Sequence, residues 1–298
     1  MIDKLEMFIA LARERHFGRA AEACGVTQPT LSVAIRQLEE QLGVQLVWRG
    51  SRFGGLTPEG ARVLDWARKI VADSRTMREE MRAARQGLAG RIRLGVIPTA
   101  LAMASDLSMA FSKRHPNVHF SIFSRTSIEI LEMMENLEID AGVTYLDNEP
   151  LGNVTSVPLY RERYTLVCAP GHILFERHEV GWAEVGISPL CLLTPDMQNR
   201  RIIDQQLAAA GIAEAPTVES NSTVVIIAHV MSGRWATILP VKLAEFHARA
   251  RRLRVIPIRE PDLDHSVGLI APHREPHTPV LAALLQEAGE IAERGDDR

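Results

Sequence analysis

The stretch from Phe17 to Leu56 limits what this chain can fold into more than any other part of the sequence. It holds two short helical patterns that meet at a turn. In the first pattern, Ala20, Ala21 and Cys24 fall on one helical face, and the glycine directly after Cys24 ends the pattern. Two short helices that meet at a glycine-containing turn are typical of a helix-turn-helix, so we expect that motif here.

The second pattern has its own start and stop signals. The Thr27 hydroxyl can accept a hydrogen bond from a free amide in the first turn, and Pro29 is well tolerated there. Gly43 suits the left-handed residue that ends a helix. The apolar residues at helical spacing, which face inward, are Leu31, Ile35 and Leu38. The residues left facing outward are Thr30, Ser32, Val33 and Arg36.

The second helix of such a motif can enter the major groove of DNA with its N-terminal residues nearest the base edges. The residues of this helix that we predict to contact DNA are Gln28, Pro29, Thr30, Ser32 and Arg36. The following stretch, 46–56, holds Trp48, Arg49, Arg52 and Phe53 before a pair of glycines, which suits a hairpin wing against phosphate and the minor groove. The alternative is a buried helix pair with a solvated charged face, but the complete pattern and the wing arginines favour DNA.

The same residues carry a resemblance to the LysR-type transcriptional regulators. The matching residues are Ala20, Ala21, Val26, Gln28, Pro29, Leu31, Ser32, Ile35, Leu38, Glu39, Leu42, Gly43, Leu46, Arg49, Leu56, Thr57, Pro58 and Gly60. Family members often carry a polar or basic residue directly after the serine, where this chain has Val33 and Ala34. Direct contacts to bases are therefore expected from Gln28, Thr30 and Arg36 together with Ser32, and Val33 could touch a thymine methyl.

Charge is distributed unevenly along the chain. Residues 1–90 carry 14 Lys and Arg against 11 Asp and Glu, a net charge of +3, whereas the remainder carries 20 against 26, a net charge of −6. A basic N-terminal part followed by an acidic remainder fits DNA binding confined to one end. A length of 298 residues with 46% hydrophobic residues suggests about two domains with substantial cores.

Composition also sets aside several classes of protein. No run of about 18 apolar residues predicts a membrane span, and the acidic N-terminus MIDKLEMF lacks a signal-peptide core. Cys24, Cys168 and Cys191 are scattered and odd in number, which fits a reducing cytoplasm rather than a disulfide framework. The sequence shows no zinc-ligand cluster, P-loop or dinucleotide fingerprint, so we expect neither metal nor cofactor.

A long helix is predicted from Pro58 to about Arg85. Apolar and small residues recur in alternating steps of four and three: Val63, Ala67, Ile70, Ser74, Met77, Met81, Ala84 and Leu88. Such a heptad seam with charged flanks favours pairing with a second chain over packing on its own domain. The resemblance implies a dimer through this helix and commonly a tetramer of two dimers.

Residues 86–90 are predicted to form a hinge, after which strands alternate with helices. Strands are expected at 92–96, 118–122 and 139–145, with helices between them, and this order predicts a parallel sheet. The predicted fold is a multidomain α+β protein with an N-terminal winged helix-turn-helix, a linker helix and an effector domain. The resemblance implies that the effector domain has two α/β lobes like those of periplasmic binding proteins. The expected domains are 1–57, 58–90 and 91–298, with the first lobe at about 91–161 and 266–298 and the second at about 162–265.

A small molecule is expected in the cleft between the lobes, where helix N-termini favour anions. Six polar residues follow strands or precede helices at this cleft: Thr99, Thr126, Ser127, Thr144, Thr194 and Asn221. We hypothesise a small anionic metabolite, with a carboxylate as the favoured class. For each residue singly, capping a helix is the simpler role. Arg200 and Arg201 are candidate charge partners, although adjacent arginines on a helix are usually solvated.

The leading hypothesis for function is a sequence-specific regulator of transcription, bound to double-stranded DNA and controlled by an effector that distinguishes two conformations. The residues do not distinguish activation from repression, and activation would imply contact with RNA polymerase. The alternative is a thiol redox sensor that uses Cys168 or Cys191, although no close pair marks a resolving cysteine. No acid, base and nucleophile constellation indicates an enzyme.

Overall fold

The computed structural model describes residues 1–48, 53–147, 149–213, 216–249, 252–259 and 264–296. Three short helices form the N-terminal end of the molecule: α1 (Ile2–Glu14), α2 (Phe17–Ala23) and α3 (Gln28–Leu42). Their shared apolar core includes Phe8, Leu11, Leu31 and Leu38, all fully buried. We call these three helices, with the strand bridge between Val47 and Leu56, the head.

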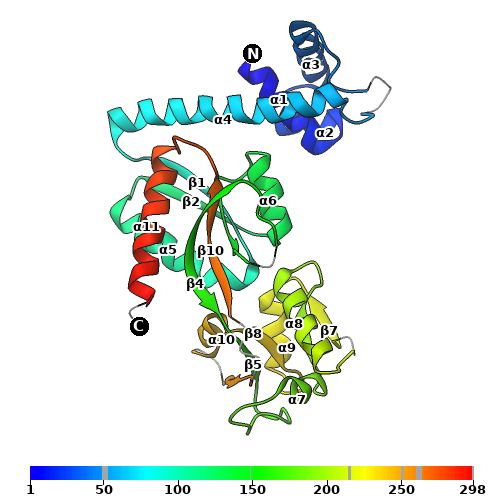
Figure 1. Cartoon of the computed structure of the whole chain (residues 1–298), viewed down its shortest axis with the longest axis vertical. Coiled ribbons are helices and arrows are strands. Elements are labelled where there is room, and N and C mark those ends of the chain that lie inside the picture. The colour runs from blue at the N-terminus through cyan, green and yellow to red at the C-terminus, as the bar shows by residue number, and fades with distance from the viewer. Residues whose placement is uncertain (49–52, 148, 214–215, 250–251, 260–263, 297–298) are drawn as a thin grey trace.

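The helix α4 (Pro58–Gln86) leaves the head and extends along one end of the rest of the molecule (Figure 1). Gly60 in its first turn lies so close to the strand bridge that an added Cβ would come within 2.0 Å of the Leu46 carbonyl oxygen. At its other end, Gly87 has φ 72°, a left-handed conformation that glycine adopts readily. The Thr57 hydroxyl also accepts a hydrogen bond from the Gly60 amide, so both ends of this helix have local capping signals.

The first lobe is a five-stranded sheet in the order β2-β1-β3-β10-β4. Its elements are β1 (Gly90–Val96), η1 (Pro98–Ala100), α5 (Leu101–Arg114), β2 (Val118–Ser124), α6 (Ser127–Glu135), β3 (Ala141–Tyr145), β4 (Val154–Glu162), β10 (His265–Pro272) and α11 (Pro279–Asp296). Strands β1, β2 and β3 are parallel as predicted, but β10 pairs antiparallel with both β3 and β4. The sheet is therefore mixed, and β4 is a strand that the sequence pattern did not predict.

The second lobe consists of two small sheets, ordered β8-β5-β9 and β6-β7. Its elements are β5 (Tyr164–Cys168), α7 (Trp182–Gly186), β6 (Cys191–Leu193), α8 (Gln198–Ala209), β7 (Val218–Ser220), α9 (Thr223–Val230), β8 (Thr237–Pro240), α10 (Val241–Ala248) and β9 (Arg254–Pro257).

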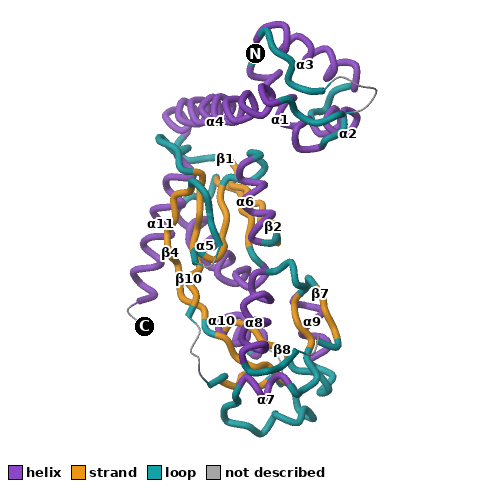
Figure 2. Tube along the Cα trace, turned by 45° about the vertical axis from the view of Figure 1, so that its right-hand side comes forward, coloured by secondary structure: helices purple, strands orange, loops and turns teal. Residues whose placement is uncertain are grey.

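Figure 2 shows the head, the first lobe and the second lobe one after another along the long axis of the molecule. Only Arg163 separates β4 of the first lobe from β5 of the second. The chain returns from the second lobe to the first at β10. The register pairs His265 with Glu162, so both chain crossings lie side by side. No described helix has the length and apolar character that crossing a membrane requires.

Candidate functional site

The exposed face of α3 holds the side chains that the sequence assigned to DNA. Gln28, Pro29, Thr30 and Arg36 are exposed and Ser32 is half-buried, while Leu31, Ile35 and Leu38 are buried on the opposite face. The Thr27 hydroxyl accepts a hydrogen bond from the Thr30 amide at 3.4 Å and lies 2.9 Å from the Thr30 hydroxyl. The first turn of α3 is thus capped by Thr27, and its polar side chains face solvent.

The helix before it is capped by a residue that the sequence pattern did not assign. The Nδ1 atom of His16 accepts hydrogen bonds from the amides of Gly18 and Arg19, at 3.1 and 3.3 Å. This contact fixes the beginning of α2 next to the start of α3, since a Cβ at Gly18 would lie 3.8 Å from the Gln28 side-chain oxygen. The sequence signal that could have predicted this cap is the position of His16 directly before a helical pattern.

The wing is formed in part by residues that the structure describes. Val47 and Leu56 form an antiparallel bridge, and the Trp48 amide donates to the Gly55 carbonyl oxygen at 3.0 Å. The Trp48 side chain is 53% exposed. Arg49 and Arg52, which we predicted to contact DNA, lie outside the described residues, so their contacts stay a prediction.

The predicted seam of α4 is divided between two surroundings. Ala67 belongs to the apolar core of the head, and Ser74 is also buried. Further along the helix the seam is uncovered in the single chain. The large apolar side chains exposed on α4 are Trp66, Ile70, Met77 and Met81. The first part of the predicted seam is therefore covered in part, since Ala67 and Ser74 are buried and Ile70 between them is exposed; pairing through the seam stays a prediction.

At the chain crossings, a buried carboxyl group lies among all three tyrosines of the chain. The hydroxyls of Tyr145 and Tyr160 donate to the two oxygens of Glu162 at 2.6 and 3.0 Å, and the Tyr164 hydroxyl lies 3.1 Å from that of Tyr145. Glu162 is only 1% exposed, and burial raises the pKa of its carboxyl to about 7, against the lowering effect of these hydrogen bonds. We call Glu162 and the three tyrosines the crossing cluster.

Sequence reasoning missed the crossing cluster, although a signal was present. Tyr160, Glu162 and Tyr164 alternate in sequence, which places them on one face of an extended chain. The ring of His265 lies edge-on to Tyr145 and Tyr164, with centroid distances of 6.3 and 6.1 Å. The cluster therefore joins both crossings and both lobes.

The six predicted effector residues lie in different surroundings. Thr99 and Thr144 are buried, and their hydroxyls make no hydrogen bond within 3.5 Å in the described part of the chain. The Thr126 hydroxyl accepts from the Glu129 amide in a capping box, the simpler role considered above. The Thr194 hydroxyl is buried in the segment before the N-terminus of α8, whereas Asn221 is exposed.

Ser127 takes part in a contact between the lobes. Its hydroxyl donates to Glu149 at 3.1 Å, and the other oxygen of Glu149 accepts a hydrogen bond from Arg201 at the start of α8. A carboxylate thus lies between the beginning of α6 and a guanidinium group of the second lobe.

Arg200 differs from the expectation of a solvated side chain. It is 6% exposed and bonds Asp204 and Glu219, each at 2.6 Å, and the Leu193 carbonyl oxygen at 2.8 Å. Its positive charge is therefore already compensated within the second lobe. The adjacent Arg201 pairs with Glu149 of the first lobe, so only one of the two arginines takes part in the contact between the lobes.

The cysteines of the second lobe are poor candidates for thiol chemistry. Cys168 and Cys191 are fully buried, and burial raises the pKa of their thiols to about 11 and about 12. A thiolate, the reactive form, is correspondingly disfavoured. Among the described residues, no group of three or more His, Cys, Asp and Glu side chains could hold a metal ion.

A winged helix-turn-helix, a long exposed-seam helix and two α/β lobes joined by paired crossings define a ligand-responsive DNA-binding protein. Residues 2–61 match the family model for the bacterial regulatory helix-turn-helix protein of the lysR family, and residues 85–292 match that for the LysR substrate binding domain. The chain therefore belongs to the LysR family of transcriptional regulators, and it is a regulator rather than an enzyme.

Individual relatives agree with this assignment. A probable hydrogen peroxide-inducible genes activator of Mycobacterium avium is 30% identical over 271 residues, covering 89% of this chain and 86% of that protein. A substituted full-length OxyR from Pseudomonas aeruginosa has a TM-score of 0.75 at 25% identity, covering 98% and 96% of the two chains. The fold of full-length CbnR, solved in complex with its target DNA, is similar at a TM-score of 0.63 and 21% identity, covering 98% and 100%.

Proposed function

We propose that the outward face of α3 contacts operator DNA in the major groove, through Gln28, Pro29, Thr30, Ser32 and Arg36. The observation that carries this proposal is the opposition of faces on α3, where polar side chains are exposed and the apolar ones are buried in the head. Arg49 and Arg52 of the wing are proposed to contact phosphate. The solved CbnR complex shows that a protein of this fold binds its target DNA.

The test is operator binding by an Arg36→Ala variant. An operator would first be selected from random duplex DNA with the wild-type protein at physiological salt. Loss of one good side-chain contact should weaken operator binding by roughly 5- to 150-fold, which corresponds to about 1–3 kcal/mol. Arg252→Ala, an exposed residue of the second lobe, is the matched control and should bind as the wild type does. Equal affinities of the wild type and Arg36→Ala would contradict the assignment.

We propose further that two chains pair through the exposed apolar stripe of α4 and that two such dimers form a tetramer. Trp66, Ile70, Met77 and Met81 support this proposal because a stripe of this size would otherwise stay in water. A pair of heads would match two half-sites on DNA. The proposed divisions are 1–57 for the head, 58–90 for the linker and 91–298 for the effector domain, and the proposed location is the cytoplasm. If the regulator activates transcription, it would also contact RNA polymerase.

The effector is proposed to bind between the lobes, near Thr99, Thr126, Ser127, Thr144, Thr194 and Asn221. The contact of Glu149 with Ser127 and Arg201 supports an anionic effector, because a carboxylate of the chain itself already occupies this position. An effector carboxylate would compete with Glu149 for the same two partners. The distance between the two lobes would then depend on which carboxylate is bound.

A second candidate is sensing of peroxide through a thiol, since the Mycobacterium avium relative is named as a peroxide-inducible activator. The burial and raised pKa of Cys168 and Cys191 count against this candidate. A double variant, Cys168→Ser with Cys191→Ser, separates the two. Retained regulation by the variant would exclude a role for both thiols, and lost regulation with an intact fold would favour the thiol sensor.

A further inference from the structure

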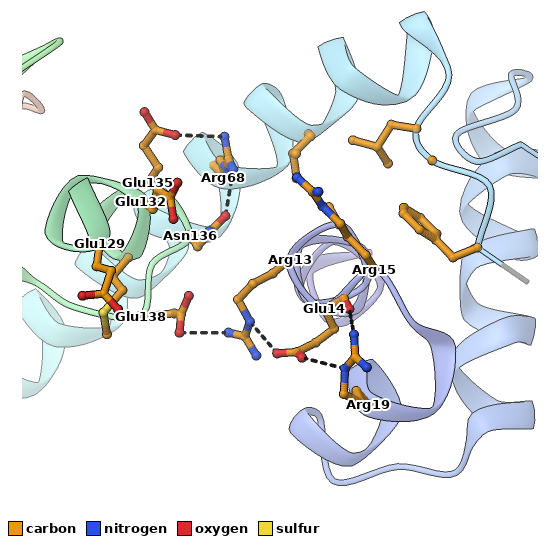
Figure 3. A pocket seen from close by; sticks show the side chains of 16 residues that line it. Arg13, Glu14, Arg15, Arg19, Arg68, Glu129, Glu132, Glu135, Asn136 and Glu138 are labelled. Atoms are coloured by element: carbon orange, nitrogen blue, oxygen red, sulfur yellow. Dashed lines mark hydrogen bonds and ion pairs between the residues drawn. The ribbon is translucent and has the colours of Figure 1, made fainter. Parts of the chain in front are cut away.

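The turn between α6 and β3, residues 136–140, lies against the head and α4. Arg68 of α4 donates to the Asn136 side-chain oxygen at 2.8 Å, and Arg13 of α1 lies 3.7 Å from Glu138 (Figure 3). Arg75 of α4 donates to the Leu137 carbonyl oxygen at 3.2 Å. Contacts from three consecutive residues of the turn thus reach both α1 and α4.

The side chain of Leu137 extends this contact into the apolar core. Leu137 packs against the buried cluster of the head, and among the described residues it is the one apolar residue of the first lobe that does so. It borders a hollow that is also lined by Ala10 of α1 and Val71 of α4. The first lobe therefore packs a half-buried apolar residue against the core of the head.

The backbone of Leu137 shows that local structure alone does not favour leucine here. Leu137 has φ 60°, in the left-handed region. It follows the last turn of α6, where its amide bonds the Met134 carbonyl oxygen and the Glu138 amide bonds that of Met133. Glycine is the usual residue at this position, and a side chain with a Cβ strains the left-handed backbone. The contact with the head offsets that strain.

The turn is also fixed to the sheet of the first lobe. Arg93 of β1 donates to the Leu137 carbonyl oxygen at 3.0 Å and to the two carboxylate oxygens of Asp140 at 2.6 and 3.2 Å. The Arg93 amide donates to Asp140 as well, at 2.7 Å. A displacement of β1 would therefore move Leu137.

Charge on the two sides of this junction is complementary. A groove of about 1090 Å³ separates the head from α6. Figure 3 shows Arg13 and Arg19 of the head and Arg68 of α4, which face Glu132, Glu135 and Glu138 of the first lobe. Opposite charges favour one docked orientation over others.

We propose that Leu137 docks the first lobe onto the head and α4, and that this docking holds the head at one orientation across the Gly87 hinge. The proposal rests on the proposed function of the head in DNA binding, because a fixed orientation matters most when two heads must meet two half-sites together. Docking orients the heads before DNA binds, so less entropy is lost on binding.

Leu137→Gly tests the docking directly. Glycine suits the left-handed backbone, so the variant should fold, and it removes only the side chain that reaches the head. Exposed Arg85 and Arg91 flank the hinge and are trypsin sites. Trypsin should cut there at least fivefold faster in Leu137→Gly. Leu137→Met keeps an apolar side chain and should be cut within twofold of the wild-type rate. Equal rates for the wild type and Leu137→Gly would overturn the proposal.

DNA binding gives a second, independent measurement. With a selected operator, Leu137→Gly should bind duplex carrying two half-sites at least tenfold more weakly, and a single half-site within twofold of the wild type. An equal loss on both duplexes would mean that the side chain supports the fold of the head rather than its orientation, and would overturn the proposal. If the wild type preferred no DNA, the proposed function would fail, while the trypsin result would still decide the docking.

Discussion

At the scale of single residues, Glu162 is a buried group whose ionisation should affect the stability of this protein. Its carboxyl has a pKa near 7 in the folded chain, raised by burial from its ordinary value of 4.5. The folded state therefore holds this proton more tightly than the unfolded state does. The associated stability is complete below about pH 4.5 and is lost as the pH rises through about 7.

We expect the free energy of unfolding of the wild type to fall by on the order of 1 kcal/mol per pH unit between pH 5 and 7 through this group. Glu162→Gln cannot ionise, so its stability should depend less steeply on pH over that range. Denaturant unfolding at several pH values measures both slopes. Glu176→Gln, with its side chain 90% exposed, should keep the wild-type slope. Parallel slopes for Glu162→Gln and the wild type would contradict this prediction.

A glycine holds α4 against the head. Because a Cβ at Gly60 would approach the Leu46 carbonyl oxygen to 2.0 Å, Gly60→Ala forces the strand bridge and α4 apart. We expect the head to lose about 1–3 kcal/mol of stability, as in other overpacked sites. Guanidinium unfolding followed by circular dichroism measures this loss.

The matched control is Gly289→Ala in α11, where the added Cβ meets no atom within 4 Å. That substitution should stabilise the chain by roughly 0.5–1 kcal/mol, since alanine is the better helix former. A Gly60→Ala variant as stable as the Gly289→Ala variant would show that the head tolerates the added methyl group.

At the scale of elements, α4 serves two partners with different faces. Its buried face, with Leu64, Ala67 and Val71, belongs to the core of the head, and its exposed stripe continues toward the hinge. One helix can therefore orient its own head and pair with a second chain. This division explains why only part of the heptad pattern is free.

Met77→Asp combined with Met81→Asp should disrupt the pairing of chains, because each places a charge within the apolar stripe. Met77 and Met81 are 58% and 60% exposed in the single chain, so the monomer should keep its fold. We expect the dissociation constant of the dimer to rise at least tenfold, measured by sedimentation velocity. Arg78→Ala with Arg82→Ala, on the neighbouring face, is the control. An unchanged constant in the aspartate variant would place the dimer interface elsewhere.

At the scale of the whole molecule, charge separates the DNA-binding end from the sensor. The net charge of +3 over residues 1–90 contrasts with −6 over the remainder. Binding through phosphate contacts at the basic end should depend strongly on salt, because each contact releases counterions. The acidic lobes should repel DNA and leave the heads as the contact surface.

We therefore expect operator affinity to fall by at least about tenfold between 50 and 200 mM salt, with the logarithm of affinity linear in the logarithm of salt concentration. Fluorescence anisotropy with a labelled operator measures the slope. Arg36→Ala should lower the slope by about one if this residue contacts phosphate, and leave it unchanged if Arg36 contacts a base. A flat salt dependence in the wild type would show that phosphate contacts contribute little.

The sequence alone determined the elements whose signals are local. Thr27, Gly43, Thr57 and Gly87 cap helices where the pattern predicted starts and ends, because capping depends on one residue and its near neighbours. The helix-turn-helix also follows from spacing, since the buried positions of α3 recur at helical intervals. The resemblance to the LysR-type regulators rested on this same region, with Gly43 and Thr57 among its residues.

Only the tertiary structure decided what depends on residues far apart in the chain. The antiparallel place of β10, the crossing cluster around Glu162 and the burial of Arg200 each need partners that local patterns do not specify. Leu137 is the clearest case, because at its own turn glycine would be favoured. Its physical reason for being leucine lies in a core formed by residues 60 and more positions away.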